Sequence, residues 1–560
     1  MKEISDKVIS FIVKRPWFVI LFVILFVVSA LGFLPKITID NSVDVFFDKN
    51  SKSYIDFQEW KEQFGSDQIV IVAFEDKDIF TADNLTLISD LTEKFESIKN
   101  VSEVTSLTNV NNIIGFENDF IVEPLVEDVP SDLEELKEIK EQALSNPLYV
   151  KNLISKDAST TAFIIELEHK PHTASDIYKK EVIENIQKIL NNDVPRDKKF
   201  YISGFTAIEY FYALYMQEDL KKFMPFIFLI IIFILYLSFR CLAGVVLPLI
   251  TIVITLVLTL LFLYLCGFSI NNVTSIVPPI ILAIAVADSI HFVGANILKQ
   301  KISGMDKDSL LVESMKQLFF PCLLTTITTS VGFLSLTVSR IPPVKELGVV
   351  VGGGVIIAFL VTFIFLPAAI KQFKLFQKQS NDELDIKVTG KGIFDKRIDG
   401  FLEGVGRFNQ KFRYIVLSVF LLIVVFSFWG LSKVKTETSV LEYFKKSSPI
   451  YQATTFVENN LSGVHFLNVS IKAKSLDYFK EPNSLKNIEK LQSFLKLIPE
   501  VDKTTSVVDY IKEINKSFHN EEGEYYRIPE SKELIAQYLL LYGDTDLNDF
   551  VDSEWKWTTV

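Results

Sequence analysis

Hydrophobic residues in this chain are concentrated in seven long runs that alternate with polar segments. The runs cover 16–34, 223–239, 242–266, 273–296, 318–338, 345–370 and 413–432. An α-helix needs roughly 20 mostly apolar residues to cross a bilayer, so we predict seven spanning helices. The first run ends in Pro35-Lys36 without an A-x-A-like cleavage site, and we therefore interpret it as a retained span rather than a signal peptide.

Lysine and arginine residues next to these runs predict the orientation of the chain. They gather before the first run, between the fourth and fifth, and between the sixth and seventh, whereas 267–272 contains none. Basic loops stay in the cytoplasm, so the N-terminus is predicted to be cytoplasmic and the protein a multi-pass protein of the cell inner membrane. The predicted parts are 1–34 (cytoplasmic N-terminus and first span), 35–222 (first extracytoplasmic domain), 223–370 (spans two to six), 371–412 (cytoplasmic linker), 413–432 (seventh span) and 433–560 (second, incomplete extracytoplasmic domain).

The polar segments have the periodicity of mixed α/β domains. The first predicts strands over 68–74, 101–107, 160–168 and 199–203, with helices over 82–99 and 174–190. This is the split βαβ order of a ferredoxin-like unit. An insertion between the second and third strands contains Ser131-Asp132-Leu133-Glu134, a capping-box pattern that predicts a further helix. The second segment predicts a strand over 465–473, a helix over 484–497 and a strand over 501–507, and a helix over 205–222 is predicted to run directly into the second span.

An internal repeat relates the two ends of the chain. The motif Asn41-Ser42-Val43-Asp44-Val45-Phe46-Phe47 returns as Thr438-Ser439-Val440-Leu441-Glu442-Tyr443-Phe444, at an offset of 397 residues. Such a stable offset predicts a duplicated unit of one span, an outer domain and five more spans. The second copy ends inside a predicted strand at Val560. We therefore expect that the chain is a fragment, or that a second chain supplies the missing C-terminal half.

Composition and charge exclude several functional classes. The net charge of −12 does not favour a nucleic-acid partner. The polar segments contain no set of nucleophile, base and acid and no clustered metal ligands, so we expect neither an enzyme nor a metal or other cofactor. His169 and His172 are close in sequence, but two ligands alone are a weak metal signal, and we interpret them as solvated surface residues.

One candidate site lies inside the fourth run. Asp288 stands in the middle of this predicted span, where a charged carboxylate costs about 2.5–3.5 kcal/mol on insertion scales, and burial favours the protonated form. His291 follows one turn later on the same helix face. Ala285 keeps that face small, so that a neighbouring helix can approach. We expect the fifth span as that neighbour, with the hydroxyls of Thr325 and Thr329 hydrogen-bonded to Asp288 and with Gly332 on the same face.

Structural alternatives remain open for each of these residues. Asp288 can be a hydrogen-bond partner that only stabilises the fold, and His291 can be a packing residue at the membrane boundary. The threonines can satisfy the carbonyls of their own helix. Pro278-Pro279 is expected to start or kink its helix, and Gly352-Gly353-Gly354 to permit close packing of the sixth span.

The span arrangement, the outer domain and two motifs carry a resemblance to a known family. Ala283-Ile284-Ala285-Val286-Ala287-Asp288-Ser289-Ile290-His291 and Thr325-Thr326-Ile327-Thr328-Thr329-Ser330-Val331-Gly332 look like signatures of the fourth and fifth spans of the RND superfamily. The chain specifically resembles the MMPL-like predicted exporters with a sterol-sensing-type (SSD) membrane domain. This resemblance implies the one-plus-five span repeat, with the second repeat incomplete. It also implies proton-driven export of hydrophobic or lipid-like substrates, with Asp288 at the proton-relay position.

Two departures and three rival functions accompany this resemblance. Ala283 replaces a frequent glycine of the family, and the chain never reaches the tenth span, where the family usually has a matching acidic site. The implied partners are membrane lipids, a hydrophobic small molecule or lipid substrate, and other copies of the chain in a homo-oligomer. The rivals are a non-transporting sterol- or lipid-sensing scaffold, a proton-driven accessory of protein secretion, and a fragment that is inactive alone. The sequence does not identify the substrate.

Overall fold

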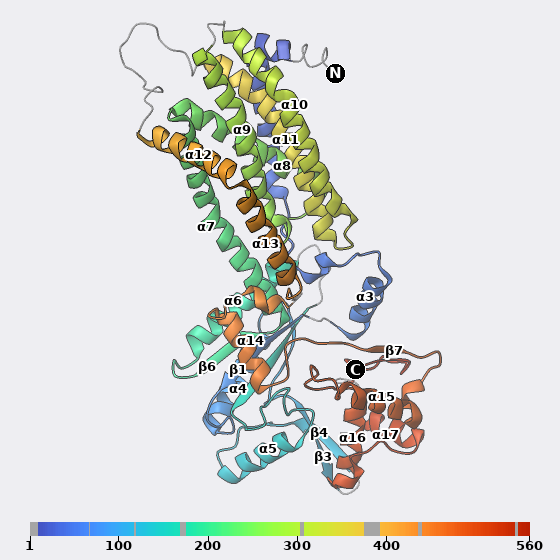
Figure 1. The fold of residues 1–560 in the computed structure, drawn as a ribbon. Coiled ribbons are helices and arrows are strands. Elements are labelled where there is room, and N and C mark those ends of the chain that lie inside the picture. Colours follow the sequence, from blue (N-terminus) through green and yellow to red (C-terminus); the bar gives the residue numbers. More distant parts are fainter. Residues whose placement is uncertain are drawn as a thin grey trace. The chain divides into compact units, whose positions relative to one another are not determined.

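The computed structural model describes residues 9–65, 68–116, 119–168, 175–302, 307–373, 393–434, 439–543 and 547–560. Within these ranges, seven helices are long and apolar enough to cross a membrane, and they coincide with the seven predicted spans (Figure 1). These helices are α2 (Pro16–Phe33), α7 (Phe205–Phe239), α8 (Leu242–Leu265), α9 (Val277–Ile302), α10 (Lys307–Leu334), α11 (Pro342–Phe373) and α13 (Arg413–Leu431). The protein is therefore mostly helical and membrane-bound.

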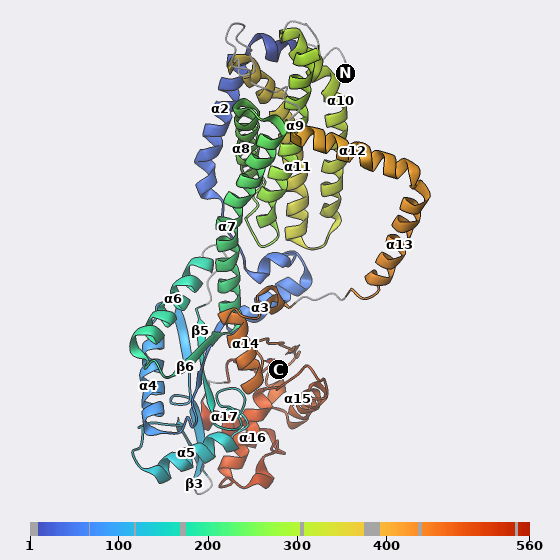
Figure 2. The same ribbon diagram turned by 60° about the vertical axis from the view of Figure 1, so that its left-hand side comes forward.

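The chain divides into two compact units. The membrane unit contains Met1–Thr38, Leu220–Ser339 and Val344–Glu442, and the polar unit contains Ile39–Asp219, Arg340–Pro343 and Tyr443–Val560. Both predicted outer segments thus contribute to the same polar unit. Helix α7 is continuous over 35 residues and belongs to both units (Figure 2), as predicted from the helix that runs into the second span.

Small residues let the spanning helices α8, α9 and α11 pack closely. A Cβ atom on Gly354 would lie 2.5 Å from Ile281 and 2.8 Å from Thr259, so these three helices meet at this level. A Cβ on Gly352 would lie 2.9 Å from Leu334 of α10, and one on Gly353 would collide with the ring of Phe262 of α8. The prediction for the glycine triplet is therefore confirmed. Pro278 and Pro279 lie in the first turn of α9, where prolines disturb no helical hydrogen bond.

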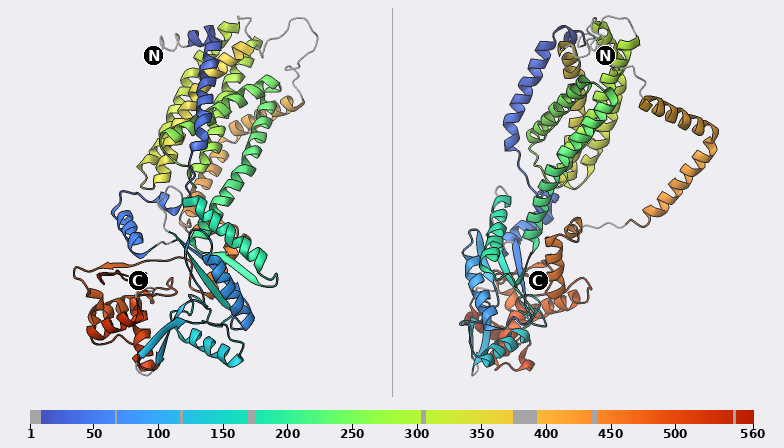
Figure 3. Two further views of the ribbon diagram at one scale, coloured as in Figure 1. Left: turned by 180° about the vertical axis from the view of Figure 1, so that it is seen from behind. Right: turned by 90° about the vertical axis from the view of Figure 1, so that its left-hand side faces the viewer.

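A four-stranded antiparallel sheet forms the centre of the polar unit. Its strands are β1 (Ile69–Glu75), β2 (Val101–Thr105), β5 (Thr160–Leu167) and β6 (Lys199–Ser203), in the order β2-β5-β1-β6. Helices α4 (Ala82–Glu96) and α6 (Ser175–Asp193) contact each other and lie on one face of the sheet (Figure 3). The rings of Phe95 and Phe163 meet at 5.3 Å between sheet and helix. All four predicted strands and both predicted helices are present, with ends that differ by a few residues.

Glu166 is a pH-sensitive position in this sheet. It lies directly across from Glu103 on β2. Burial, together with the negative charges of Asp549 and Glu103, raises the pKa of Glu166 to about 7. A carboxyl with a raised folded-state pKa binds more protons in the folded than in the unfolded chain, so stability falls as the pH rises from about 4.5 to about 7.

Replacing Glu166 with glutamine is therefore expected to stabilise the polar unit above pH 7. The gain should be about 1–3 kcal/mol at pH 8 and should vanish below about pH 4.5, where the carboxyl becomes protonated in both states. Thermal unfolding of the full chain at a series of pH values measures this difference. The exposed Glu123→Gln on β4 (Asp119–Pro124) serves as the control, and a pH-independent effect of Glu166→Gln would contradict the explanation.

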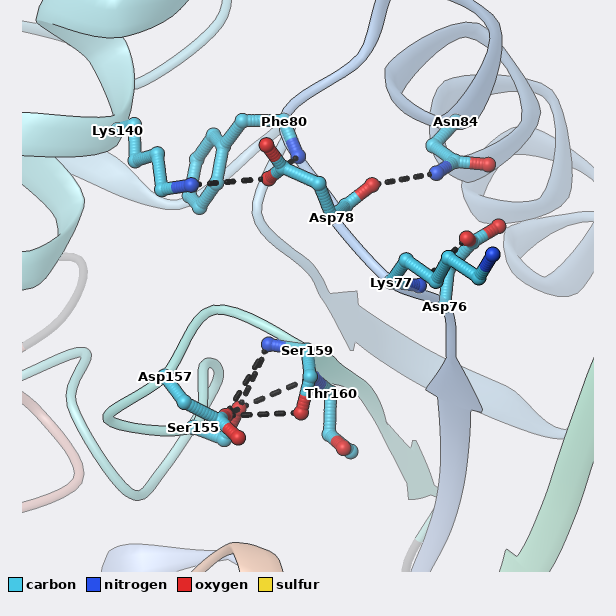
Figure 4. Close-up of polar contacts among 10 residues, drawn as sticks. All are labelled: Asp76, Lys77, Asp78, Phe80, Asn84, Lys140, Ser155, Asp157, Ser159 and Thr160. Carbon is cyan, nitrogen blue, oxygen red and sulfur yellow. Dashed lines mark hydrogen bonds and ion pairs between the residues drawn. The ribbon is translucent and has the colours of Figure 1, made fainter.

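Charged and polar groups hold the loops at one end of β1 (Figure 4). A hydrogen bond from Lys198 lowers the pKa of Asp76, and the Lys140 ammonium lies 3.1 Å from the Asp78 carboxylate. Hydroxyl hydrogen bonds from Ser155, and then from Ser159, lower the pKa of Asp157 before β5 begins. These groups are satisfied by one another, which explains the ordered corner without invoking a ligand.

The insertion between β2 and β5 differs in detail from its prediction. The expected helix is present as α5 (Leu133–Ser145), but its N-cap is Asp132 and no side chain caps it. The capping box at Ser131–Glu134 is therefore wrong. A hairpin of β3 (Asn111–Phe116) and β4 was not predicted.

The second polar segment contains more helix than predicted. Its elements are α14 (Pro449–Asn460), β7 (Ser470–Lys472), α15 (Pro482–Leu495), α16 (Val507–Phe518), α17 (Lys532–Tyr542) and β8 (Trp557–Thr559). The helix predicted over 484–497 is present as α15, but the strand over 465–473 is reduced to the three residues of β7. β7 pairs with β8.

The strand predicted over 501–507 is wrong. The chain there is irregular and leads into α16, which Ser506 and Asp509 open with a capping box. The Lys503 ammonium donates to the carbonyl oxygens of Leu148 and Val150, at 3.3 and 2.7 Å. The Ser506 backbone N–H donates to the Asp509 carboxylate within this cap, at 2.8 Å, rather than to a neighbouring strand.

The β3–β4 hairpin is part of the core of the second polar segment. Ile113 and Phe120 are buried in one cluster with Ile511, Ile514 and other residues of α15, α16 and α17. The Ser517 hydroxyl donates to the Ile113 carbonyl at 3.1 Å, and no room remains for a Cβ on Gly115 beside the Ser517 carbonyl. The two polar segments consequently share a hydrophobic core.

Several elements recur at the offset seen in the sequence. Helices α2 and α13 begin 397 residues apart, and so do α3 (Lys52–Phe64) and α14. Their caps also correspond, since the Ser51 hydroxyl accepts from the Tyr54 amide and the Ser448 hydroxyl accepts from the Tyr451 amide. The sequence repeat therefore coincides with repeated local structure at these positions.

Candidate functional site

Asp288 lies in the middle of α9, which packs against both α8 and α10. Its side chain is half-buried, between the fully buried Ser289 and the exposed Ala287. Within the described ranges, no side chain hydrogen-bonds to or forms a salt bridge with the carboxylate, and His291 is within electrostatic range of it. A carboxyl group in this position can exist in either protonation state without breaking a fixed ion pair.

His291 lies one turn further along α9, as predicted. Its side chain is exposed, and its imidazole is within electrostatic range of Asp288. The structure thus brings the two titratable groups together, while His291 lies on the outer face of the helix.

The neighbour of Asp288 on α10 is Cys322, which sequence reasoning missed. Cys322 is buried, and its thiol is within electrostatic range of the Asp288 carboxyl. Cys322 lies three residues before Thr325 and seven before Thr329, which places all three on one helix face. This spacing was the available signal, and the packing of α9 against α10 places α10 beside Asp288.

The predicted threonine hydrogen bonds to Asp288 are not formed. The Thr325 hydroxyl donates to the carbonyl of Cys322 at 2.8 Å, and Thr328 donates to the carbonyls of Leu324 and Thr325. Thr325 is exposed and Thr329 half-buried. The hydroxyls of Thr325 and Thr328 therefore satisfy their own helix, which was the structural alternative.

The two predicted packing residues behave differently. Ala285 is fully buried in the core of the bundle, which confirms its role in close packing. The assignment of Gly332 to packing is wrong, because a Cβ atom there would have nothing within 4 Å. Ser330 makes the close contact instead, since its hydroxyl donates to the Gly352 carbonyl of α11 at 2.9 Å.

A group of fully buried hydroxyls lies at the depth of Asp288. Thr251 of α8, Ser289 of α9 and Thr362 of α11 are each 0% exposed. Thr259, Ile281 and Gly354 meet at one level of the bundle. Thr251, Ser289 and Thr362 are each eight residues away along the same three helices, which corresponds to about 12 Å, and therefore share a second level. Among the described residues, the Ser289 and Thr362 hydroxyls have no hydrogen-bond partner. The bundle interior beside Asp288 is therefore partly polar, which sequence reasoning did not detect.

A second carboxylate of the membrane unit was also passed over. Glu346 lies near the start of the predicted sixth span and accepts a hydrogen bond from the Asn271 amide at 2.9 Å. Asn271 is buried, and its side-chain oxygen accepts from the amides of Val273 and Thr274 ahead of α9. Glu346 thus has a fixed structural partner, in contrast to Asp288.

The structure suggests no metal centre in the parts of the chain that it describes. No group of three or more histidine, cysteine, aspartate or glutamate side chains is suitably arranged there. His169 and His172 lie outside the described residues. The titratable site that the geometry supports is consequently the pair of Asp288 and His291, with Cys322 as the facing residue.

Comparison with known proteins agrees with this architecture. The chain is 22% identical over 379 residues to a protein of Methanocaldococcus jannaschii named "Putative membrane protein MJ1562", and the match covers 66% of this chain and 94% of that protein. The family model described as MMPL family matches residues 46–374, which include the polar-unit sheet, the second to sixth spans and Asp288. More than half of the chain thus follows this pattern, and the chain belongs to the MMPL family of the RND superfamily.

Proposed function

We propose that the protein is a proton-driven exporter of hydrophobic or lipid-like compounds. The observation that carries this proposal is the Asp288 carboxyl, which lies within a spanning bundle without a hydrogen-bond or salt-bridge partner among the described side chains. Such a group is costly to keep as a charge, and intramembrane carboxyls generally serve transport or proton transfer. Membership of the MMPL family supports the same reading.

Proton movement through Asp288 would supply the driving force. The carboxyl takes up a proton from the outer side and loses its charge, and α9 then repacks against the Cys322 face of α10. His291 exchanges the proton with Asp288, and the buried hydroxyls of Ser289 and Thr362 stabilise the proton on its way. Moving one charge across the membrane yields about 2.3 kcal/mol per 100 mV.

The polar unit would couple this energy to the substrate. We assign its four-stranded sheet to a ferredoxin-like porter domain and the recurring elements to an RND-type internal repeat. The continuous helix α7 connects the β6 end of the sheet to the second span and serves as the mechanical link. The proposed setting is the cell inner membrane, with the N-terminus cytoplasmic and the polar unit outside, in a homo-oligomer or with a partner chain. The proposal includes no enzymatic activity and no cofactor.

The function is tested with the full chain in liposomes that contain a pH-sensitive dye. Addition of an apolar compound under an imposed pH gradient is expected to accelerate proton flux, and the gradient is expected to move the compound between leaflets or out of the membrane. A lipid-sensing scaffold would bind the compound equally well with and without the gradient. Compound movement that is independent of the gradient would therefore refute the exporter.

A further inference from the structure

Helix α12 (Ile393–Lys411) leads directly into the seventh spanning helix. Phe412 is the single residue between α12 and α13, so the end of α12 lies within about 7 Å of the start of the span. Phe412 has non-helical backbone angles, with φ −111° and ψ 25°, and the two helices meet at an angle there (Figure 2). The surroundings of the first turn of α13 are therefore also those of the last turn of α12.

One face of α12 carries an uncovered apolar stripe that extends into this junction. Its members share one side of the helix because they follow at intervals of four, three and four residues: Phe401, Val405, Phe408 and Phe412. Phe401 is 70% and Phe408 53% exposed. Over 400–411, no side chain that the structure describes is buried. Such a stripe normally lies against another surface.

The rest of α12 is polar or small, which distinguishes it from a spanning helix. Gln410 follows Phe401 by nine residues, or two and a half turns, and therefore lies on the opposite side. Gly400, Gly404 and Gly406 weaken the helix, and a Cβ atom on any of them would meet nothing within 4 Å. A weak helix with one apolar stripe needs an external surface, and this pattern is typical of helices that lie in a membrane interface.

The adjoining span identifies the surface that covers the stripe. None of the described residues of α13 is buried, and Tyr414 and Leu417 in its first two turns are 72% and 70% exposed. These side chains belong to a helix that is apolar enough to cross a membrane. Because the stripe ends at Phe412, it is continuous with the surface that α13 exposes to lipid. The bilayer is therefore the occupant that fits the stripe.

The charges at the junction are positive and define the lipid. No acidic residue occurs over 404–436. Glu403 pairs with Arg407 at 2.9 Å, which leaves Lys411 and Arg413 without a carboxylate among the described residues. Each of these two cations lies over the ring of the residue that follows it, 5.3 and 4.8 Å from the ring centre. Basic residues beside a span attract anionic head groups.

We propose that the α12–α13 junction binds anionic phospholipids, with the apolar stripe at the acyl-chain boundary and with Lys411 and Arg413 on the head-group phosphates. Helix α12 then lies in the plane of the leaflet in which α13 begins and anchors the start of that span. This inference is independent of the proposed transport, because such binding needs neither Asp288 nor a proton gradient.

Site-specific photocrosslinking of the full chain tests the stripe. The liposomes contain phosphatidylcholine and phosphatidylglycerol at about 7:3, so that both neutral and anionic head groups are present. We expect p-benzoylphenylalanine in place of Phe401 or Phe408 to form lipid adducts, detected by mass spectrometry, and the same group in place of Gln410 to form none. Crosslinks from the stripe to a second copy, which the spacing of Gly400 and Gly404 would suit, would overturn the proposal, as would absence of lipid adducts.

Seating of the stripe is separated from helix stability by two aspartate variants. Phe408→Asp should reduce the lipid adducts formed at position 401 about tenfold, equivalent to about 1.4 kcal/mol. Gln410→Asp introduces the same side chain into the same turn on the polar face and should leave the adducts unchanged. An equal loss in both variants would refute the seating of the stripe in the bilayer.

The preference for anionic lipid is tested with the crosslinker in place of Phe412. The ratio of phosphatidylglycerol to phosphatidylcholine adducts should exceed that of the mixture at least about fivefold, equivalent to about 1 kcal/mol. Lys411→Gln combined with Arg413→Gln should return the ratio to that of the mixture. Lys137→Gln, which removes an exposed cation from α5, should leave it unchanged. A ratio equal to that of the mixture in the unaltered chain would overturn the anionic site, whatever the outcome of the transport assay.

Discussion

Replacing Asp288 with asparagine is expected to abolish gradient-driven transport and to leave the protein folded in the membrane. Asparagine has nearly the same volume but cannot gain or lose a proton, so α9 loses the charge change that would alter its packing against α10. Because no salt bridge to Asp288 exists among the described side chains, the substitution leaves no unpaired buried cation. Proton flux and compound movement in liposomes should fall to the level of protein-free vesicles.

Three control variants make this result specific. Asp288→Glu keeps the proton and should retain partial activity, whereas His291→Gln should slow the flux without abolishing it. Glu346→Gln removes the carboxylate near the start of the sixth span and should retain transport, since Glu346 has a fixed partner in Asn271. Full transport by Asp288→Asn would refute the proton-driven mechanism, and loss of the folded protein would assign Asp288 a structural role.

Replacing Gly115 with alanine is expected to destabilise the polar unit strongly. A Cβ atom at this position would collide with the Ser517 carbonyl, a backbone atom of α16 that cannot rotate away. The β3–β4 hairpin would have to shift, and the burial of Ile113 and Phe120 in the core of the second polar segment would be lost in part. Such overpacking costs about 1–3 kcal/mol, to which the lost apolar contacts add.

Thermal unfolding and limited proteolysis of the full chain measure this effect. The unfolding midpoint of Gly115→Ala should fall, and cleavage near the hairpin and α16 should accelerate. Gly523→Ala is the matched control, because a Cβ there has nothing within 4 Å. If both variants unfold like the unaltered chain, the hairpin is not seated on α16 as described.

Most of the membrane architecture could be predicted from the sequence. A spanning helix satisfies its own backbone and needs only a continuous apolar run, so each of the seven spans is encoded within its own residues. The same holds for Asp288, whose position in the middle of such a run is visible without neighbours. The strands and helices of the polar-unit sheet follow equally from local periodicity of two and 3.6 residues.

Several failed predictions depend on contacts between residues far apart in the chain. A strand was predicted over 501–507, yet the Lys503 ammonium bonds carbonyls more than 350 residues away and Ser506 caps a helix. Packing was assigned to Gly332, and hydrogen bonds to Asp288 were assigned to the threonine hydroxyls, from helix spacing alone. Spacing shows which residues share a helix face but not which residues lie opposite that face.

The sequence by itself thus determined the seven spans, the continuous helix into the second span and the carboxyl at position 288, because each arises from contacts within a short stretch. Only the tertiary structure decided that Cys322 faces this carboxyl and that the β3–β4 hairpin completes the core of the distant segment. These features arise only where two or three segments meet. Burial and steric fit between segments produce no periodic pattern in the sequence of any one segment, so the sequence did not predict them.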